Sequence, residues 1–327
     1  MIRGLLFSVA ALLSCANAQA GADWIEKSNA CTAPVLDLDA KYQPEAGSLF
    51  GAEQFDEGVL DLNPQVYERS QADAGVLLAD LKARAAAEQD EKVRQDLEIL
   101  ITSVANRIES SRLNYELMLP FVNASETVFR GLQLLLDPRN KPERQQRAVT
   151  RLKRYAGMER GHEPLTELAR ARTEERFDVP SLTGPYTREV EKAIANTESF
   201  IDGLADMFRE AKLRGWDKAH RELAQQLRDY DRWLAQEMMP RARTDNRLPQ
   251  AIYADNLKQF GVYMSPQELI DRTTFGFTEI RSQMQVLARD IAREQNLPDS
   301  DYRAVMKELK ARQIAGDAIL PQLAGGS

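Results

Sequence analysis

Apolar residues recur every three or four positions along most of this chain, and that period constrains its fold more than any other feature. Between Val93 and Ile108 they step by 4, 3, 4 and 4 residues, which places them on one face of a long helix. The same spacing marks 190–208, 223–238 and 273–291. No stretch alternates apolar and polar residues as a half-buried strand does. The sequence therefore predicts an all-α fold.

Proline and capping residues mark where several of these helices begin and end. Ser265 suits a helix cap, Pro266 suits the first helical position, and Pro240 ends the helix before them. Apolar spacings near 3.5 residues favour antiparallel helices that pack at shallow angles. We therefore expect a multi-helix array of long antiparallel helices.

The first twenty residues have the pattern of a secretory signal peptide. Arg3 precedes a short apolar run over residues 5–13, which cannot span a bilayer, and small-x-small cleavage sites follow. Residues 1–20 are thus predicted to direct export to the periplasm or the extracellular space. The residues before Cys15 also resemble a lipoprotein box, which would lipidate Cys15 and anchor the protein to a membrane. Soluble export is the favoured alternative of the two.

The rest of the chain is predicted to form one irregular and one helical region. Residues 21–62 contain Pro34, Pro44 and several glycines, which favour an extended, irregular lead-in with room for one short helix. Residues 63–327 carry the helical pattern and form the predicted helical domain. After signal cleavage Cys31 is the only cysteine, so no intramolecular disulfide can form.

Composition and motifs exclude several classes of function. The formal net charge is −7 with dispersed basic residues, which argues against nucleic-acid binding, and no apolar run predicts a transmembrane span. A catalytic zinc site usually takes three protein ligands, but His162 and His220 are 58 residues apart and neither has a second histidine one turn away. We therefore assign no catalytic residue, metal ligand or cofactor to this chain. Its oligomeric state is left open.

An arginine-rich segment between two predicted helices is the most distinctive local feature. Arg241, Arg243 and Arg247 fall within seven residues. Guanidinium forks suit carboxylate recognition, including the end of a peptide. The alternative is an ordered linker whose arginines bind carboxylates and helix ends.

The last third of the chain resembles a known family. The stretches that carry the resemblance are Tyr230-Asp-Arg-Trp-Leu234, Pro240-Arg-Ala-Arg-Thr-Asp-Asn-Arg-Leu-Pro249, Tyr253-Ala-Asp-Asn-Leu257, Phe275 through Ile291, and Asp301-Tyr-Arg through Gly316-Asp-Ala-Ile319. Over roughly 216–320 the chain is similar to the bacterial domain-of-unknown-function family 885, whose members are mostly exported proteins or lipoproteins.

The resemblance implies a fold like the non-catalytic half of a channel-type zinc metallopeptidase. Family members carry a His-Glu-Ala-x-Pro-Gly-His motif, where a zinc-activated water would hydrolyse a peptide bond. This chain lacks that motif. Zinc is therefore implied only for a missing half, and a peptide substrate only for the full-length fold. Arg243, Arg247 and Tyr253 match positions that wall the family's channel, which makes them the substrate-binding candidates.

Two functions follow from these observations. The first is the N-terminal helical portion of an exported metallopeptidase-like hydrolase, inactive alone and truncated or split from its catalytic half. The alternative is a stand-alone helical binding or scaffold protein of the cell envelope.

Overall fold

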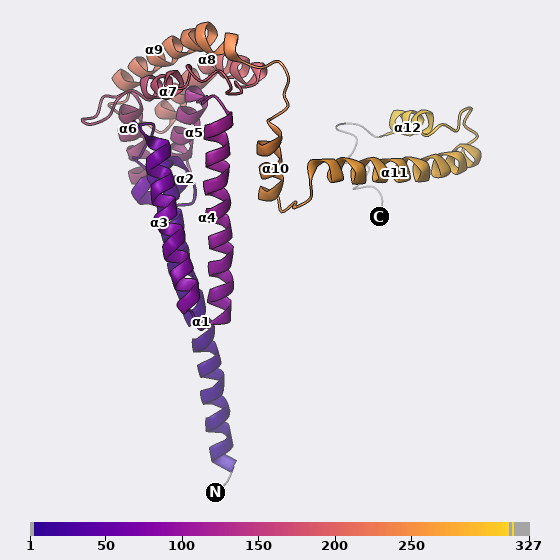
Figure 1. Ribbon diagram of the computed structural model, residues 1–327, viewed down its shortest axis with the longest axis horizontal. Helices are drawn as coiled ribbons and strands as arrows, with labels where there is room; N and C mark the ends of the chain where they lie inside the picture. The colour runs from indigo at the N-terminus through magenta and orange to yellow at the C-terminus, as the bar shows by residue number, and fades with distance from the viewer. Residues whose placement is uncertain (1–2, 314–315, 317–327) are drawn as a thin grey trace. The chain divides into compact units, whose positions relative to one another are not determined.

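The protein is built from helices (Figure 1). The computed structural model describes the backbone of residues 3–313 and 316, and the side chains of residues 23–313 and 316. Isolated backbone bridges in these residues do not extend into strands, so the all-α prediction is confirmed. The chain divides between Asn256 and Leu257 into two compact units. In chain order the elements are α1 (Arg3–Tyr42), α2 (Pro44–Leu49), η1 (Glu53–Phe55), α3 (Val66–Ala87), α4 (Glu91–Leu117), α5 (Ala124–Leu136), α6 (Pro142–Tyr155), α7 (Leu165–Glu174), α8 (Thr187–Glu210), α9 (Asp217–Trp233), η2 (Leu234–Met238), η3 (Met239–Arg241), α10 (Gln250–Gln259), α11 (Pro266–Glu294) and α12 (Tyr302–Ala311).

The structure corrects the irregular lead-in predicted for residues 21–62. α1 and α2 make its first half helical, and Pro34 lies inside α1. A proline costs a helix one backbone hydrogen bond, yet packing along the same helix can outweigh that loss. Cys31 and Val35 are buried against α3 and α4, with Trp24 packed beside them. These three residues are spaced by seven and four positions, which places them on one face of α1.

The predicted signal peptide, residues 1–20, and Cys15 lie outside the residues whose side chains the structure describes. Cys31 is a buried free thiol. None of the described helices combines the length and the apolar run that crossing a bilayer requires.

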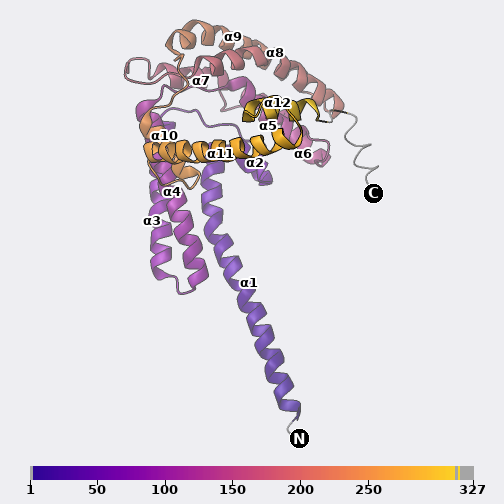
Figure 2. The same cartoon turned by 90° about the vertical axis from the view of Figure 1, so that its right-hand side faces the viewer.

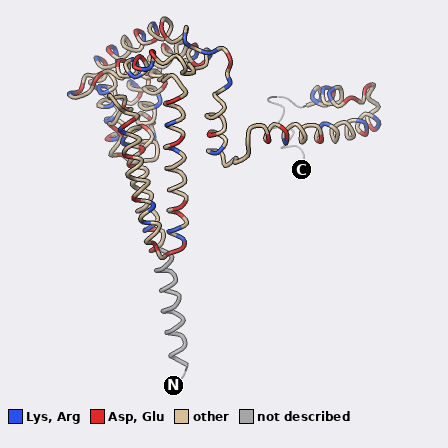
Figure 3. Tube along the Cα trace, in the orientation of Figure 1, with Lys and Arg blue, Asp and Glu red and all other residues tan. Residues whose placement is uncertain are grey.

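α3 and α4 form an antiparallel hairpin that packs against α1 (Figure 2). Asp90 caps α4, because its side chain accepts a hydrogen bond from the main-chain N–H of Lys92. Val93, Leu97 and Val104 are buried, as the apolar period predicts. Acidic and basic residues are spread along the hairpin instead of gathering in one patch (Figure 3). The hairpin brings the start of α3 beside the end of α4.

The larger core of the first unit lies among α5, α6, α7, α8 and α9. Phe208 is fully buried in it and stacks on Trp216, with the ring centroids 5.1 Å apart. The buried faces of α8 and α9 are those predicted for 190–208 and 223–238. After α9 the chain passes through the π-helical turn η2 and the 3₁₀ turn η3, which contains Pro240.

α6 carries a row of arginines that hold the short α2–η1 segment. Arg151 is fully buried and donates to main-chain carbonyls of α5 and η1, at 2.9 and 2.8 Å. Asp56, also buried, accepts hydrogen bonds from Arg144 and Arg147 at 2.9 and 3.0 Å. Burial opposes ionisation of Asp56, but hydrogen bonds from Arg144 and Ser48 outweigh it, so its pKa is lowered. Without these bonds the α2–η1 segment would leave buried polar groups unpaired.

The second unit is formed mainly by α11 and α12, which pack against each other. Ala288 and Val305 are buried between them. Ser265 caps α11 as predicted, since its Oγ accepts from the main-chain N–H of Glu268 at 3.1 Å.

Candidate ligand-binding site

None of the three substrate-binding candidates lines a pocket described below. Arg243 holds its own loop, because its main-chain N–H donates to the Pro185 carbonyl at 2.9 Å and its guanidinium donates to Gly184. Arg247 is exposed and pairs at 3.4 Å with the acid two positions earlier. Tyr253 is exposed on α10. Nε of Arg243 is buried without a hydrogen-bond partner among the described residues.

The two histidines do not fit the zinc site that the family resemblance implies for other members. His220 Nε2 lies 2.9 Å from the carbonyl oxygen of Ile201, and its ring meets Trp216 edge-on. His162 Nδ1 is buried without a hydrogen-bond partner among the described residues. Nowhere in that part of the chain do three His, Cys, Asp or Glu side chains gather as a metal site. We therefore derive no metal-dependent step from these side chains.

A pocket of about 800 Å³ opens where the start of α3, the end of α4 and the end of α7 meet. Tyr67, Tyr115, Phe121, Arg172 and Arg176 line it. We call this cavity, with these five residues, the aryl–arginine pocket. Its volume lies in the range of small-molecule sites, about 300–1,000 Å³.

Two stacked tyrosines form one wall of the aryl–arginine pocket. The ring centroids of Tyr67 and Tyr115 are 3.7 Å apart and their planes differ by 2°. Tyr67 lies in the first turn of α3 and Tyr115 near the end of α4, so the hairpin creates the pair. Burial, reinforced by the negative charge of Glu116, raises the pKa of Tyr67, which keeps its phenol neutral. Such a pair offers a flat surface for an apolar group at little entropic cost.

Two arginines carry unused donors at this pocket. The Cζ of Arg176 lies 4.1 Å from the centroid of the Tyr115 ring, and its Nη2 donates to the Tyr115 carbonyl at 3.0 Å. Arg172 pairs with Glu175 at 2.6 Å, and only 12% of its side chain is exposed. Nε of both arginines and Nη1 of Arg172 are buried without partners among the described residues. Nε of Arg151, Arg154 and Arg243 is also buried without a partner in the described part of the chain, so the second unpaired donor of Arg172, its Nη1, distinguishes this pocket.

Acidic side chains share the pocket with these arginines. Glu175 is occupied by Arg172. Glu189 accepts the main-chain N–H that precedes α8, at 3.2 Å. Glu68 lies 3.4 Å from the Tyr115 hydroxyl. The pocket therefore presents both signs of charge and suits a ligand that carries both.

The edge of the pocket contains backbone strain. Gln65 lines it and has a φ of 58°, in the left-handed region that non-glycine residues rarely adopt. Strain of this kind costs on the order of 1–3 kcal/mol and gathers at ligand sites and switch regions. The conformation sets the entry of the chain into α3, which begins one residue later and carries Tyr67 in its first turn.

A comparison with models of known protein families identifies the family of this chain. The model of a bacterial protein family of unknown function, DUF885, matches residues 44–322. The chain belongs to the DUF885 family. The match extends well before residue 216 and contains all five residues that define the aryl–arginine pocket. No curated protein and no solved structure matches the chain.

Sequence reasoning missed the pocket of this DUF885 chain for a physical reason. Arg172 and Arg176 are four residues apart, a spacing that can share a helix face, but α7 ends at Glu174, between the two arginines. Tyr67 and Tyr115 are 48 residues apart, and nothing local predicts their stacking. Their pairing depends on the register of the α3–α4 hairpin, which is set by packing over the whole length of both helices.

Proposed function

We propose that this DUF885 chain is the helical, substrate-binding portion of an exported metallopeptidase-like hydrolase, and that the aryl–arginine pocket receives the free carboxyl end of a peptide. The observation that carries the pocket assignment is the set of unused guanidinium donors on Arg172 and Arg176 beside stacked tyrosines. The hydrolase class comes from the family resemblance alone.

A peptide end fits the chemistry of the pocket in three ways. A carboxylate accepts paired N–H donors from a guanidinium, and Arg172 and Arg176 have such donors. An apolar or aromatic side chain can pack on Tyr67 and Phe121. A short peptide also carries an ammonium group, which the carboxylate of Glu68 can attract.

The test is a comparison of two peptides that differ only at the carboxyl end. Ala-Ala-Phe with a free carboxylate and its C-terminal amide are titrated into the protein by calorimetry. Because hydrogen bonds to charged groups are the strong ones, the free acid is expected to bind about 10- to 100-fold tighter than the amide. Equal affinities would contradict the proposed carboxylate contact.

Matched arginine variants locate the contact. Arg176→Met replaces the aliphatic part of the side chain but removes the charged guanidinium, and is expected to abolish the preference for the free acid. Arg170→Met is the control, because Arg170 lies on the same helix, is exposed, and pairs with Glu174 at 2.7 Å. If Arg170→Met weakens the preference as much as Arg176→Met, bulk charge explains the binding and the pocket assignment fails.

We further propose that the chain of 327 residues binds such peptides without cleaving them, because its sequence lacks the His-Glu-Ala-x-Pro-Gly-His motif of the family. Metal analysis of the purified chain is expected to find no stoichiometric zinc. Stoichiometric zinc together with cleavage that a chelator stops would contradict this expectation.

A stand-alone binding module of the cell envelope is the second candidate. It is favoured by the core of the first unit, which is contained within residues 62–238. Both functions predict the same peptide binding. DNA sequencing beyond the codon for residue 327 separates them: a His-Glu-Ala-x-Pro-Gly-His coding stretch there supports the hydrolase, and its absence supports the module.

Export also belongs to the proposal. The pattern of residues 1–20 supports a cleaved signal peptide, so intact-mass analysis of the protein from its native host is expected to show a start after Ala18 or Ala20. A start at Cys15 with added lipid mass would support the membrane anchor, and retention of Met1 would contradict export.

A further inference from the structure

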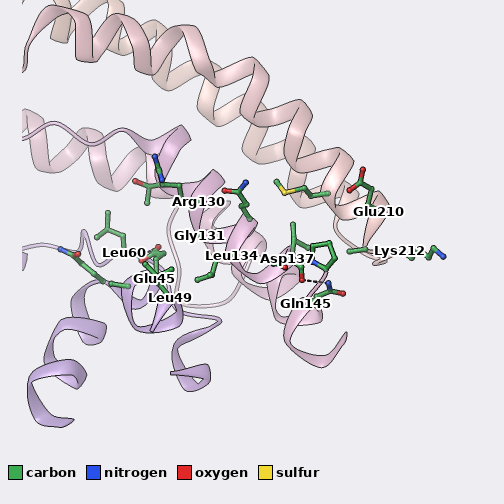
Figure 4. A pocket seen from close by; sticks show the side chains of 18 residues that line it. Glu45, Leu49, Leu60, Arg130, Gly131, Leu134, Asp137, Gln145, Glu210 and Lys212 are labelled. Carbon is green, nitrogen blue, oxygen red and sulfur yellow. Dashed lines mark hydrogen bonds between the residues drawn. The ribbon is translucent and has the colours of Figure 1, made fainter. Parts of the chain in front are cut away.

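A second cavity, of about 1160 Å³, lies between α2, α5 and the end of α8 (Figure 4). It shares no lining residue with the aryl–arginine pocket. Leu49, Leu60, Leu134 and Met207 give it apolar walls, and Glu45 places a carboxylate among them. We call it the Glu45 cavity.

The carboxylate of Glu45 is held rigidly through one of its two oxygens. Oε1 accepts both the Tyr155 hydroxyl at 2.6 Å and the Leu60 main-chain N–H at 2.9 Å. Two donors on one oxygen suit an ionised carboxylate. Oε2 has no hydrogen-bond partner among the described residues, and Glu45 is only half-buried. The cavity therefore has one fixed acceptor atom that its own protein groups leave unused.

The interior of the protein is shaped around this carboxylate. Tyr155 is fully buried, and burial together with the negative charge of Glu45 raises the pKa of its phenol, which keeps it a donor. Gly131 makes room for the contact: a Cβ there would come within 2.4 Å of the Tyr155 hydroxyl and 3.1 Å of Glu45 Cγ. Buried Arg151 fixes Gly131 in turn by donating to its carbonyl oxygen. Contacts with the buried core therefore fix the position of the Glu45 side chain.

Basic residues of the lining do not neutralise Glu45. Arg130 is exposed and pairs with Glu126 on the preceding turn of α5, at 2.7 Å. Lys212 lies at the end of the cavity opposite Glu45 (Figure 4). Neither of these two basic side chains therefore occupies Glu45 Oε2, which stays open to a cationic group that enters the cavity.

The lining also discriminates among cations. It contains no aromatic side chain in the part of the chain that the structure describes, so it lacks the cage that quaternary ammonium groups prefer. Asp137 and Glu210 also line the cavity, but Asp137 pairs with Arg139, and no three acidic or imidazole side chains among the described residues gather to hold a hard cation such as Ca²⁺ or Mg²⁺, which needs several oxygen ligands. An ammonium with N–H donors matches a lone carboxylate oxygen best.

We propose that the Glu45 cavity binds a small molecule with a primary ammonium group and an apolar body, the ammonium donating to Glu45 Oε2 and the body lying against Leu60, Leu134 and Met207. This site is independent of the peptide pocket and of the proposed hydrolase class.

Three probes of equal chain length test the assignment by calorimetry: hexylamine, hexanol and hexyltrimethylammonium. Hexylamine is expected to bind saturably, and about 10- to 100-fold tighter than either other probe, because only it forms a charge-assisted hydrogen bond. Equal binding of amine and alcohol would overturn the role of Glu45. Tighter binding of the trimethylammonium probe would overturn the ligand class, and no saturable binding of hexylamine would overturn the site.

Substitutions then place the ammonium in the cavity. Glu45→Gln keeps an acceptor for Tyr155 and Leu60 but removes the charge, so it is expected to weaken hexylamine at least tenfold and leave hexanol unchanged. Glu143→Gln, an exposed acid on α6, is the control and is expected to change neither. Unchanged hexylamine binding in Glu45→Gln would overturn the proposal.

A second variant tests the site if Glu45→Gln disturbs the fold. Ala211→Phe fills the cavity from the end of α8 without touching Glu45, and is expected to weaken hexylamine and hexanol alike. Unchanged binding would place the probes elsewhere and overturn the site. Arg176→Met is expected to leave hexylamine binding intact. A failure of the Glu45 cavity can therefore be told apart from a failure of the aryl–arginine pocket.

Discussion

Asp231 is a half-buried carboxylate on α9, within 3.2 Å of the Thr197 hydroxyl on α8. Burial raises its pKa to about 6; the hydrogen bond from Thr197 acts in the opposite direction, and the charge of Glu198 adds to the rise. Between about pH 4 and pH 6 the folded chain therefore holds a proton that the unfolded chain has released. The free energy of unfolding falls as the pH rises through that window.

Replacing Asp231 with Asn should remove this pH-dependent penalty. The amide oxygen still accepts from Thr197, but it carries no charge. We expect Asp231→Asn to stabilise the fold by about 1 kcal/mol near pH 7.5, a value reduced for the solvent that reaches the group, and to change little near pH 4. Urea unfolding at the two pH values measures this, and a gain of equal size at both would contradict the titration.

Arg151 is the buried residue whose loss should cost the most. It is the largest of the fully buried side chains and bonds to main-chain oxygens of Gly131 and Phe55. Arg151→Met is expected to lower the free energy of unfolding by about 3 kcal/mol, because it leaves buried acceptors unpaired. Arg209→Met, at an exposed ion pair on α8, serves as the control and should cost less than about 1 kcal/mol. Similar losses in both variants would mean that the Arg151 bonds carry little energy.

At the scale of elements, α1 shows how far packing can override a local signal. Pro34 interrupts its hydrogen bonding, yet the helix continues on both sides because Cys31 and Val35 are buried against the α3–α4 hairpin. The helix is therefore less stable locally than its contacts would allow.

Pro34→Ala is expected to relieve that interruption. It restores one backbone N–H and removes the clash of the ring with the preceding turn, so we expect a gain of about 1–3 kcal/mol in the free energy of unfolding. Ala33→Pro, one position earlier and exposed, is the converse variant and should destabilise. Thermal unfolding followed by circular dichroism checks both, and destabilisation by Pro34→Ala would show that the proline is needed for the path of α1.

The sequence predicted those features that depend on residues close together in the chain, such as helix caps and the apolar face of a helix. Ser265 caps α11 where the sequence indicated it, and the stripe that begins at Val93 is the buried face of α4. The irregular structure predicted for residues 21–62 was wrong, because packing against distant helices keeps the chain helical through Pro34. Arg243 suggested a carboxylate site, but its main-chain N–H and its Nη1 bind the Pro185 and Gly184 carbonyls, and its side chain lines neither proposed pocket. Tertiary contacts decide which guanidinium N–H donors find hydrogen-bond partners. The order of residues near an arginine in the sequence does not predict those contacts.

At the scale of the whole molecule, the chain consists of two units with separate cores. The larger core and the α1–α3–α4 cluster both belong to the first unit. Each proposed pocket is also lined only by residues of that unit. Folding and binding by the first unit should therefore not require the second.

A chain of residues 23–256 is expected to fold without the second unit. Because its buried clusters are complete in themselves, it should unfold cooperatively and keep the peptide preference of the full chain. Circular dichroism melts and binding of a hydrophobic dye test the fold. A gradual melt with strong dye binding would contradict the independence of the first unit.

A crystal structure of the full chain with Ala-Ala-Phe would show whether the aryl–arginine pocket receives a peptide carboxylate. We expect the terminal carboxylate within hydrogen-bonding distance of the Arg172 or Arg176 guanidinium, with the phenylalanine ring against the Tyr67–Tyr115 wall. A peptide bound with its carboxylate at Arg243 or Arg247, or lodged in the Glu45 cavity, would contradict it.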